Sequence, residues 1–342
     1  MRAGSGRYKP RVGITLGDPA GIGPEVALKA VRDPKILAAV RPVLLGPRVA
    51  LEYYARRLKL ASRLNIALEL PDISKSGRII ALDTGGFDLP RIPFGQVHIE
   101  CGRAALAAIR RGVVLAREGL LDALVTGPIH KKSAQLAGIV GAGHTEFIAH
   151  LCGVSDVRLM LVGPRLRIIH VSAHVSLREA LDLVRRKRIV RTIQLGANVL
   201  KTLGILRPRI AVAGLNPHAS DSGLFGNEEA REIAPAVAAA RQTGLRAEGP
   251  LPPDTVFFRA NQGEFDLVVA MYHDQGHIAA KTLGFSDAVN VTAGLPIIRT
   301  SVDHGTAFDL VGQNRANPHN MKLAILLAGQ MARLPHLRRE PL

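Results

Sequence analysis

The sequence is poor in cysteine, in aromatic residues and in long apolar runs, and each shortage excludes a class of protein. Two cysteines among 342 residues are too few for a disulfide framework or a multi-cysteine zinc site, so a metal would have to rely on histidine and carboxylate. No apolar run approaches the roughly 20 residues of a membrane helix, and residues 1–10 contain no signal-peptide core. We therefore expect a soluble, cytoplasmic protein with no membrane contact.

What the chain has in abundance is positive charge. Its 45 basic and 28 acidic residues give a formal net charge of +17, which is typical of proteins that bind nucleic acid or anionic ligands. Surfaces that bind single strands usually add aromatic side chains, yet aromatics make up only 4% here and tryptophan is absent. A basic nucleic-acid-binding protein is thus kept as the alternative from another class, and a small anionic ligand is favoured. The densest basic run is Arg185–Arg188.

The apolar pattern indicates an α/β protein of about two domains, given a typical domain size of roughly 150 residues. Short apolar segments alternate with stretches of helical length, which is typical of largely parallel sheets covered on both faces. The expected strands are residues 11–16, 42–46, 120–126, 157–162, 166–171, 209–213, 266–271 and 288–292. A long helix is expected over residues 101–117, and a capping box at Ser176–Glu179 marks the start of another.

A glycine-rich loop, Gly17–Glu25, follows the first expected strand. Its spacing does not match the G-x-G-x-x-G dinucleotide fingerprint, because Val26 stands where the third Gly or Ala belongs. The next strand, ending at Gly46, also lacks the acidic residue that would bind a ribose. A standard Rossmann site is therefore not expected. The loop either makes a tight turn or faces a substrate or cofactor.

Three histidines each come shortly after the carboxyl end of an expected strand. They are His174, His218 and His273. Ligands bind at this edge of open parallel sheets, so the three side chains are candidates for one site. Imidazole suits Zn²⁺, Co²⁺ or Mn²⁺, and three protein ligands leave a position open for a substrate oxygen. The pattern indicates either a catalytic metal or three separate surface histidines. His170, inside its strand, is interpreted as a core residue.

A second group of polar residues suits an anion. Lys281 supplies a point charge, Asn290 a neutral donor and Arg299 a planar fork, which together fit a phosphate or carboxylate. Arg299 follows the apolar run 293–298, where a charge is costly unless it is paired. It therefore either binds an anionic ligand or pairs with a structural carboxylate.

Seven segments, taken in order, resemble the 4-hydroxythreonine-4-phosphate dehydrogenase (PdxA) family of pyridoxal phosphate biosynthesis. They are residues 17–25, 125–131, 143–147, 214–218, 249–255, 270–276 and 298–307. More distantly, the glycine loop and residues 304–318 resemble the isocitrate and isopropylmalate dehydrogenases. These resemblances imply two α/β/α domains of that type, not a Rossmann fold. The expected domains are residues 1–130 plus 300–342 and residues 131–299, with the active site in the cleft between them.

The resemblance also implies roles for individual residues. A divalent metal (zinc, magnesium, cobalt or manganese) would be held by His174, His218 and His273, the third histidine coming from the other subunit of a homodimer. Substrate contacts are implied for His144, Thr145, Lys281, Asn290 and Arg299. The NAD or NADP residues would be His304, Gly305 and Asn317. By position, Asp254 and Asp274 are candidates for the catalytic base or for supporting the metal.

The implied reaction is metal-dependent oxidation by NAD(P) of the secondary hydroxyl of a phosphorylated hydroxy acid. The product, a β-keto acid, decarboxylates. We place 4-hydroxythreonine 4-phosphate first as substrate. The alternatives are threonate or erythronate 4-phosphate and an aromatic cis-dihydrodiol, because residues 172–177, residues 219–223 and His277 resemble a second branch of the family.

Overall fold

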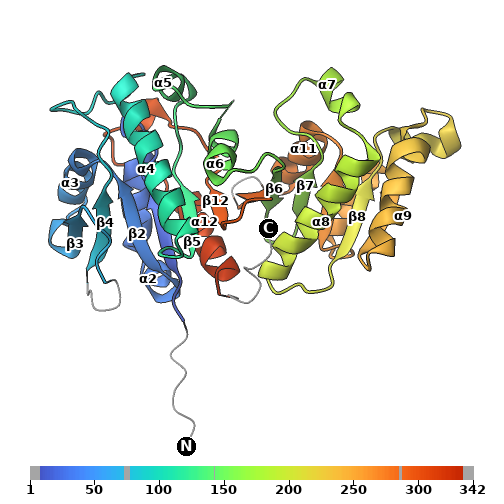
Figure 1. The fold of residues 1–342 in the computed structure, drawn as a ribbon, viewed down its shortest axis with the longest axis horizontal. Coiled ribbons are helices and arrows are strands. Elements are labelled where there is room, and N and C mark those ends of the chain that lie inside the picture. Colours follow the sequence, from blue (N-terminus) through green and yellow to red (C-terminus); the bar gives the residue numbers. More distant parts are fainter. Residues whose placement is uncertain (1–7, 73–77, 142, 285–286, 334–342) are drawn as a thin grey trace, which may run out of the picture. The chain divides into compact units, whose positions relative to one another are not determined.

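The computed structural model describes residues 8–72, 78–141, 143–284 and 287–333, and the chain in it forms two compact units (Figure 1). The first unit runs to Ser155 and resumes at Leu295, and the second runs from Asp156 to Gly294. The domain boundaries predicted at residues 130 and 300 stay a prediction. None of the helices in the described ranges combines the length and the apolar character needed to cross a membrane.

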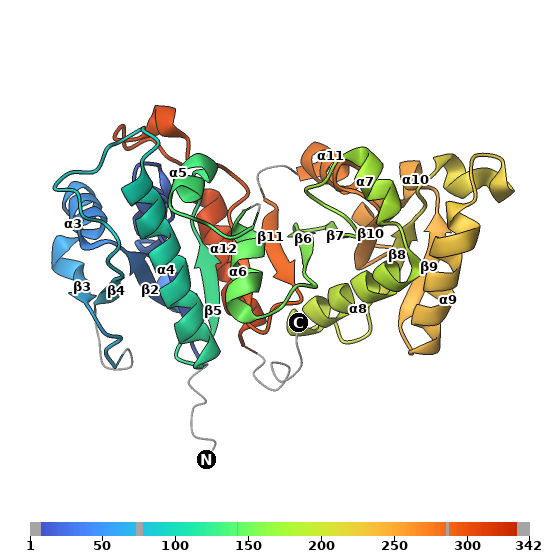
Figure 2. The same ribbon diagram turned by 45° about the horizontal axis from the view of Figure 1, so that its top comes forward.

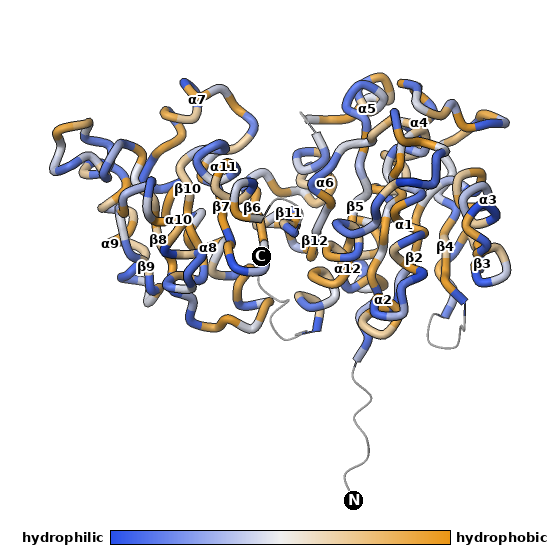
Figure 3. The backbone as a smooth tube through the Cα atoms, turned by 180° about the vertical axis from the view of Figure 1, so that it is seen from behind, coloured by the Kyte–Doolittle hydropathy of each residue, from blue (hydrophilic) through white to orange (hydrophobic). Residues whose placement is uncertain are grey.

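The first unit contains a parallel sheet with strand order β3-β4-β2-β1-β5-β12. Its strands are β1 (Arg11–Thr15), β2 (Arg41–Gly46), β3 (Leu64–Ala67), β4 (Ile79–Asp83), β5 (Ala123–Thr126) and β12 (Arg299–Ser301). Its helices are α1 (Gly23–Val31), α2 (Pro34–Ala39), α3 (Arg48–Arg57), α4 (Ile99–Arg117), α5 (Lys131–Leu136), α6 (His144–Cys152) and α12 (His319–Met331), with short turns η1 (Ala61–Arg63) and η5 (Phe308–Leu310). Helix α4 covers one face, and α1 and α12 lie on the other (Figures 1 and 3).

The second unit contains a mixed sheet with strand order β11-β6-β7-β10-β8-β9. Strand β6 is antiparallel to β7 and β11, and the other pairs are parallel. Its strands are β6 (Arg158–Val162), β7 (Arg167–His170), β8 (Arg209–Ala213), β9 (Arg246–Leu251), β10 (Leu267–Ala270) and β11 (Val289–Ala293). Its helices are α7 (Leu177–Asp182), α8 (Arg186–Thr202), α9 (Ala234–Gln242), α10 (Pro253–Asn261) and α11 (His273–Gly284), with turns η3 (Pro217–Gly223) and η4 (Glu229–Ile233).

Alternation along β7 decides what each face of the second sheet presents. Ile168 packs in a buried cluster with residues of α10 and α11, two helices labelled in Figure 2. His170 lies on the same face, because a Cβ on Gly276 of α11 would meet both His170 and Ile168. Ile169 points to the opposite face, where Gly196 allows α8 to approach closely: a Cβ there would lie 3.3 Å from Ile169 Cγ2. His170 therefore faces α11, and the intervening residue faces α8.

The eight predicted strands and the long helix are confirmed, with ends shifted by a few residues. The strands carry mostly hydrophobic residues (Figure 3), and those at the middle of each sheet are buried except at the first residue of β1, β2 and β7. The capping box is confirmed too: Glu179 N donates to Ser176 Oγ and Ser176 N to Glu179 Oε2. The predictions from the sequence did not include β3, β4, β9 and β12. Strands β3 and β12 have only four and three residues, and β9 is an edge strand with largely exposed or partly exposed residues.

Candidate functional site

The loops after β7, β10 and β8 are joined to one another by hydrogen bonds. Ser172 Oγ donates to the carbonyl of Met271 over 3.0 Å, which links the first two loops. The Gln275 side chain accepts a bond from Met271 N at 2.7 Å and donates to the Gly214 carbonyl at 2.8 Å, which links the second to the third. These three strands are neighbours in the sheet. The bonds therefore hold the loops that carry the predicted metal ligands together at the carboxyl ends of the strands.

Four histidines gather on one face of the second unit, and we call them the histidine cluster: His170, His174, His273 and His277. The ring centroids of His174 and His273 are 5.8 Å apart. His273 stacks on His277, with centroids 3.7 Å apart and planes 10° apart, and His277 lies 4.8 Å from His170. The structure thus brings together two of the three predicted metal ligands, and adds His277 from the same helix.

Asp274 fixes the orientation of the His273 ring. Its Oδ1 lies 2.7 Å from His273 Nδ1, and this hydrogen bond lowers the pKa of the Asp274 carboxyl. With the proton on Nδ1, His273 Nε2 is the atom left to bind a metal, an arrangement common around metal-binding histidines. This contact supports an orienting role for Asp274.

His218 lies in a strained turn. Residues 218–222 all have positive φ, between 44° and 70°, a conformation that costs roughly 1–2 kcal/mol for each L-residue. Glu229 anchors the start of this turn, because its Oε1 accepts bonds from Leu215 N at 2.8 Å and Asn216 N at 2.7 Å. Strain maintained by surrounding contacts is often found at functional sites.

Within one chain, His218 does not join His174 and His273. Its ring centroid is 6.5 Å from that of Phe225, and no three His, Cys, Asp or Glu side chains of the described residues form a group able to hold a metal ion. The donor chemistry nevertheless suits a transition metal: one chain supplies two close imidazoles, one oriented by a carboxylate. A third imidazole from a second subunit would complete the set that the sequence implies.

His170 is buried beneath the cluster. Its Nδ1 lies 3.1 Å from the Leu159 carbonyl and donates to it in the neutral ring, while Nε2 is buried with no partner among the described residues. Burial, with smaller contributions from the neighbouring histidines, lowers the pKa of His170 to about 3. The core interpretation is confirmed, with one nitrogen left unpaired.

The metal-free protein should lose stability on acidification because of His170. The ring stays neutral in the folded chain but takes up a proton near pH 6.5 in the unfolded chain. Its contribution to the free energy of unfolding is therefore complete above pH 6.5 and is lost as the pH falls towards 3. We expect a slope of up to about 1 kcal/mol per pH unit. Urea unfolding between pH 7 and 4 should give a shallower slope for His170→Asn, which keeps a donor for Leu159. Equal slopes would contradict the assignment.

Gly276 sets the spacing between α11 and His170. A Cβ there would lie 2.4 Å from His170 Nε2 and 2.8 Å from Ile168 Cγ2. Alanine is the better helix former by about 1 kcal/mol, yet we expect Gly276→Ala to destabilise the protein by about 1–3 kcal/mol through overpacking. Thermal unfolding measures this loss. In a His170→Ala background, Gly276→Ala should destabilise the protein by less. If the stability losses of the two substitutions simply add, the contact between residue 276 and His170 does not limit the spacing.

In the first unit, Arg299 and His144 form the candidate anion site. The Arg299 side chain is 3% exposed, and its Nε and Nη2 donate to Thr126 Oγ1 at 3.1 and 2.7 Å. Burial lowers the pKa of Arg299 to about 10, so it stays charged at neutral pH. Burial, helped by the charge of Arg299, lowers the pKa of His144, whose Nε2 is buried without a partner in the described ranges. The charge of Arg299 thus acts on a buried, neutral imidazole, and Thr145 follows His144 on α6; their binding of an anion stays a prediction.

The remaining predicted substrate and catalytic residues belong to the second unit. Lys281 lies in the last turn of α11, Asn290 on β11 and Asp254 in the first turn of α10. Their roles stay predictions.

The glycine loop lies against the predicted cofactor segment within the first unit. Ile22 N donates to the Thr306 carbonyl at 2.9 Å. Glu25 Oε1 accepts a bond from Ala316 N at 2.9 Å and pairs with Lys29 at 2.7 Å, and Lys29 Nζ donates to the Ala316 carbonyl at 3.0 Å. The loop's tight turn therefore serves to hold residues 306–316 in place.

The predicted cofactor residues leave polar atoms and space for a ligand. His304 Nδ1 is paired with the Gly305 carbonyl at 2.9 Å, whereas Nε2 is buried with no partner among the described residues. A Cβ on Gly305 would meet nothing within 4 Å. Asn317 Oδ1 accepts a bond from His319 N at 3.0 Å, so this side chain also caps α12. The structure thus has a buried nitrogen without a partner in the described part of the chain and open space at Gly305, and the cofactor role of these residues stays a prediction.

Three positioning residues were missed by reasoning from the sequence: Thr126, Gln275 and Glu229. Thr126 and Gln275 lie inside the segments 125–131 and 270–276, so a signal was present in their position. Glu229 lies outside all seven segments, and its role depends on the fold of residues 214–223.

The sequence matches the family described as "Pyridoxal phosphate biosynthetic protein PdxA" over residues 38–328. It is 44% identical over 329 residues to a D-threonate 4-phosphate dehydrogenase of Cupriavidus necator, covering 95% of this chain and 98% of that protein. It is also 44% identical over 331 residues to a 4-hydroxythreonine-4-phosphate dehydrogenase of Geobacter metallireducens, covering 95% and 96%.

Solved structures agree with these matches. A 4-hydroxythreonine-4-phosphate dehydrogenase from Klebsiella pneumoniae superposes with a TM-score of 0.86 at 42% identity, over 96% of this chain and all of that one. A phosphotransacetylase of Staphylococcus aureus and a β-decarboxylating dehydrogenase of Thermococcus kodakarensis share the fold at 18% and 14% identity, with TM-scores of 0.54 and 0.50 over 94% of this chain and 94% and 81% of theirs. The predicted isocitrate dehydrogenase-like α/β fold is thereby confirmed.

Proposed function

Because the chain belongs to the PdxA family and is an oxidoreductase acting on a phosphorylated hydroxy acid, we propose that its substrate is threonate 4-phosphate, with NAD or NADP as oxidant. The observation that carries this choice is that several similar proteins are named for D-threonate 4-phosphate, three of them 41–44% identical to this chain over 94–95% of its length. The order of preference from the sequence is thus reversed, since 4-hydroxythreonine 4-phosphate stood first there.

4-Hydroxythreonine 4-phosphate is kept as the second candidate. The Geobacter metallireducens relative named for it is equally identical to this chain. The two substrates share the carboxylate, the secondary hydroxyl that is oxidised and the phosphate. They differ at the carbon next to the carboxylate, which carries a hydroxyl in threonate 4-phosphate and an amino group in 4-hydroxythreonine 4-phosphate. Residues 172–177, residues 219–223 and His277, which resemble the second branch of the family, support the hydroxyl compound.

In this proposal the substrate phosphate binds Arg299, with His144, Thr145, Lys281 and Asn290 as further contacts. Arg299 is held in place by Thr126 and remains charged, so it presents a positioned cation to the phosphate. His144 is neutral and offers a further hydrogen bond. Binding the remote phosphate in this way positions the reacting carbon and so lowers the barrier to its oxidation.

The oxidised carbon is the one β to the carboxylate: its hydride passes to NAD(P)⁺, and its hydroxyl proton is released. A divalent metal bound by His174, His218 and His273 would supply Lewis acidity, lowering the pKa of that hydroxyl. Asp274 orients His273, and Asp254 is the remaining candidate to accept the proton. The β-keto acid then loses CO₂ and leaves dihydroxyacetone phosphate. An imidazole donor set favours zinc, cobalt or manganese over magnesium.

We propose further that the enzyme is a homodimer whose active site is shared between subunits. Large apolar side chains are exposed around the loops that carry the histidines: Leu177, Leu181, Leu224, Phe225 and Ile278 are between 45% and 71% exposed. Apolar groups gathered in this way are typical of an interface. A second subunit there would bring another set of histidine loops to the cluster.

The test is a substrate panel with the purified protein. NADH or NADPH formation and CO₂ release should be measured with threonate, erythronate and 4-hydroxythreonine 4-phosphates and a cis-dihydrodiol, each with and without a chelator. We expect kcat/KM for threonate 4-phosphate to exceed the others by about tenfold or more, and the chelator to abolish turnover. Faster turnover of 4-hydroxythreonine 4-phosphate would favour the second candidate. No turnover of any phosphorylated acid would refute the dehydrogenase assignment.

A further inference from the structure

A strongly basic cavity lies at the amino end of α8, and we call it the arginine pocket. Its volume is about 790 Å³. The lining residues are Asp156, Arg158, Arg185, Arg186, Lys187, Arg188, Val190, Arg191, Gln194 and Ala239. Six of the ten are cationic and one is acidic. The volume lies within the range of about 300–1,000 Å³ that is typical of small-molecule sites.

The arginine pocket is on the face of the second sheet opposite the histidine cluster. Arg158, at the start of β6, is bonded to Thr192 of α8, so it lies on the side of the sheet that Ile169 faces. His170 of the histidine cluster faces α11 on the other side. The pocket is therefore separate from the proposed metal site, and its lining includes none of the residues assigned to the Arg299 site.

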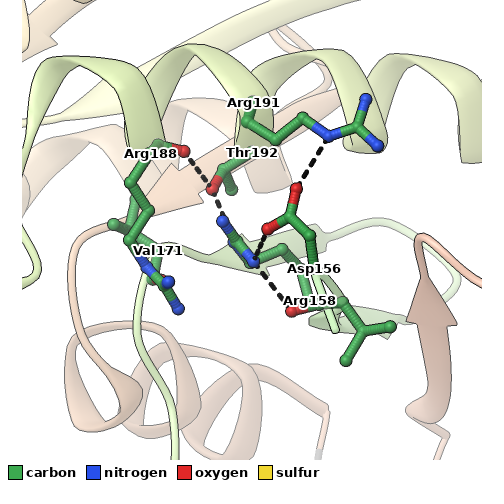
Figure 4. A network of polar contacts seen from close by, with 7 residues as sticks. Asp156, Arg158, Val171, Arg188, Arg191 and Thr192 are labelled. Carbon is green, nitrogen blue, oxygen red and sulfur yellow. Dashed lines mark hydrogen bonds and ion pairs between the residues drawn. The ribbon is translucent and has the colours of Figure 1, made fainter. Parts of the chain in front are cut away.

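One arginine of the pocket is buried and held rigidly. The Arg158 side chain is only 4% exposed. Its Nε donates to Thr192 Oγ1 at 3.0 Å, and its Nη1 donates to Asp156 Oδ1 at 2.7 Å and to the Val157 carbonyl at 2.9 Å (Figure 4). Thr192 Oγ1 in turn donates to the Arg188 carbonyl at 2.8 Å. Arg158 is therefore oriented in advance, which lowers the entropy cost of binding a ligand.

The positive charges of the pocket are only partly neutralised. Asp156 serves two guanidinium groups, pairing with Arg158 and, through its other oxygen, with Arg191 Nε at 2.9 Å. Arg188 Nε donates to the Val171 carbonyl at 2.7 Å, and burial together with the charge of Arg158 lowers the pKa of Arg188 (Figure 4). Arg158 and Arg188 thus repel each other, while the carboxylate of Asp156 is shared between Arg158 and Arg191.

Acidic residues beside the pocket reduce this excess without removing it. Arg185 pairs with Glu232 at 3.6 Å and with Asp182 at 4.0 Å, and Glu232 also accepts the backbone N–H of Arg186. With Asp156, Asp182 and Glu232 counted against the six cations, about three positive charges remain in excess around one cavity. A ligand carrying several negative charges would complete the balance.

We propose that the arginine pocket binds a small anion with two or more linked phosphate groups, such as the polyphosphate chain of a nucleoside triphosphate. The planar guanidinium fork matches phosphate oxygens, and arginine supplies five of the six cations. Val190, Ala239 and the arginine stems provide apolar wall for the rest of the ligand. A nucleic-acid strand fits less well, because the lining residues include no aromatic side chain on which bases stack.

Binding of inorganic tripolyphosphate and of ATP should be measured by isothermal titration calorimetry at about physiological salt, where exposed charges are screened beyond roughly 8 Å. Tripolyphosphate has no adenine ring, so it cannot bind a dinucleotide site through contacts to that ring. The variant Arg188→Gln/Arg191→Gln should bind both ligands at least about tenfold more weakly, because two charge-assisted hydrogen-bond donors to phosphate are lost. Arg207→Gln, an exposed arginine of the same unit, is the matched control and should bind within about twofold of the parent.

Arg186→Gln/Lys187→Gln, at exposed positions, provides a second variant should the first unfold, and it should weaken binding in the same direction. Tripolyphosphate binding that is equal in parent and variants would overturn the proposal, as would binding seen only at low salt. Binding of a short single-stranded oligonucleotide, lost in the variants while tripolyphosphate fails to bind, would replace it by a nucleic-acid surface. These outcomes do not depend on the dehydrogenase substrate.

Discussion

Replacing Arg299 by methionine is expected to lower kcat/KM for threonate 4-phosphate by about 10²- to 10³-fold. The side chain is buried and charged, and removing one partner of a buried, hydrogen-bonded charge pair costs roughly 2–5 kcal/mol. Methionine fills most of the volume but leaves the phosphate and Thr126 Oγ1 without their donor. Steady-state kinetics with the phosphorylated substrate and with unphosphorylated threonate measures the effect, and the loss should be confined to the former.

Two further variants make this result specific. Arg299→Lys keeps a charge but not the planar fork, so its activity should lie between those of the parent and Arg299→Met. Arg63→Met removes an exposed arginine of the same unit and should leave kcat/KM unchanged. If Arg299→Met folds, as judged by circular dichroism and thermal unfolding, and keeps activity within about threefold of the parent, then Arg299 does not bind the phosphate.

His218→Ala is expected to lower kcat by at least about 10³-fold and to reduce the bound metal measured by elemental analysis. An imidazole ligand is lost, and with it the metal's effect on the substrate hydroxyl. His218 is exposed and the turn around it is anchored by Glu229, so the fold should survive. His150→Ala, an exposed histidine of the first unit, is the matched control and should retain both metal and activity.

Mixing inactive variants tests which histidines come from the same chain. The resemblance implies that the third histidine in chain order, His273, comes from the other subunit. Because His174 and His273 lie close together in one chain and His218 is not grouped with them, we propose instead that His218 comes from the other subunit. Mixed dimers of His218→Ala with His174→Ala, or with His273→Ala, would then contain one intact site, giving about a quarter of the parent activity on random exchange. A mixture of His174→Ala with His273→Ala should stay inactive. Activity in that mixture would contradict the assignment of His218 to the other subunit. Absence of activity in every mixture would contradict an active site shared between subunits.

Apolar patterning was enough to predict the central strands, because their burial on both sides leaves long apolar runs. It failed for β12, where the useful residue is the charged Arg299. The cost of burying that charge did mark Arg299 as a candidate, but its partner Thr126 is 173 residues away in sequence and only the pairing of β5 with β12 brings them together. The sequence therefore predicted that Arg299 needs a partner, but it did not predict that this partner is Thr126.

The histidines illustrate a second limit. Their places after strands followed from the strand pattern, and the neighbouring order β7-β10-β8 explains why their loops meet. The left-handed path of residues 218–222 was not predictable, because none of those five residues is glycine and each disfavours positive φ on its own. The stack of His277 on His273 depends on helical spacing in α11, which begins at His273 itself.

The split of the first unit along the chain has a consequence for biosynthesis. Its sheet lacks β12, and its glycine loop lacks the bond from Ala316 N to Glu25, until the chain has left the ribosome as far as residue 316. The second unit is continuous from Asp156 to Gly294 and is therefore complete earlier. A nascent chain would thus carry a finished second unit while the first still exposes the unpaired edge of β5, an edge open to wrong pairing until the last segment arrives.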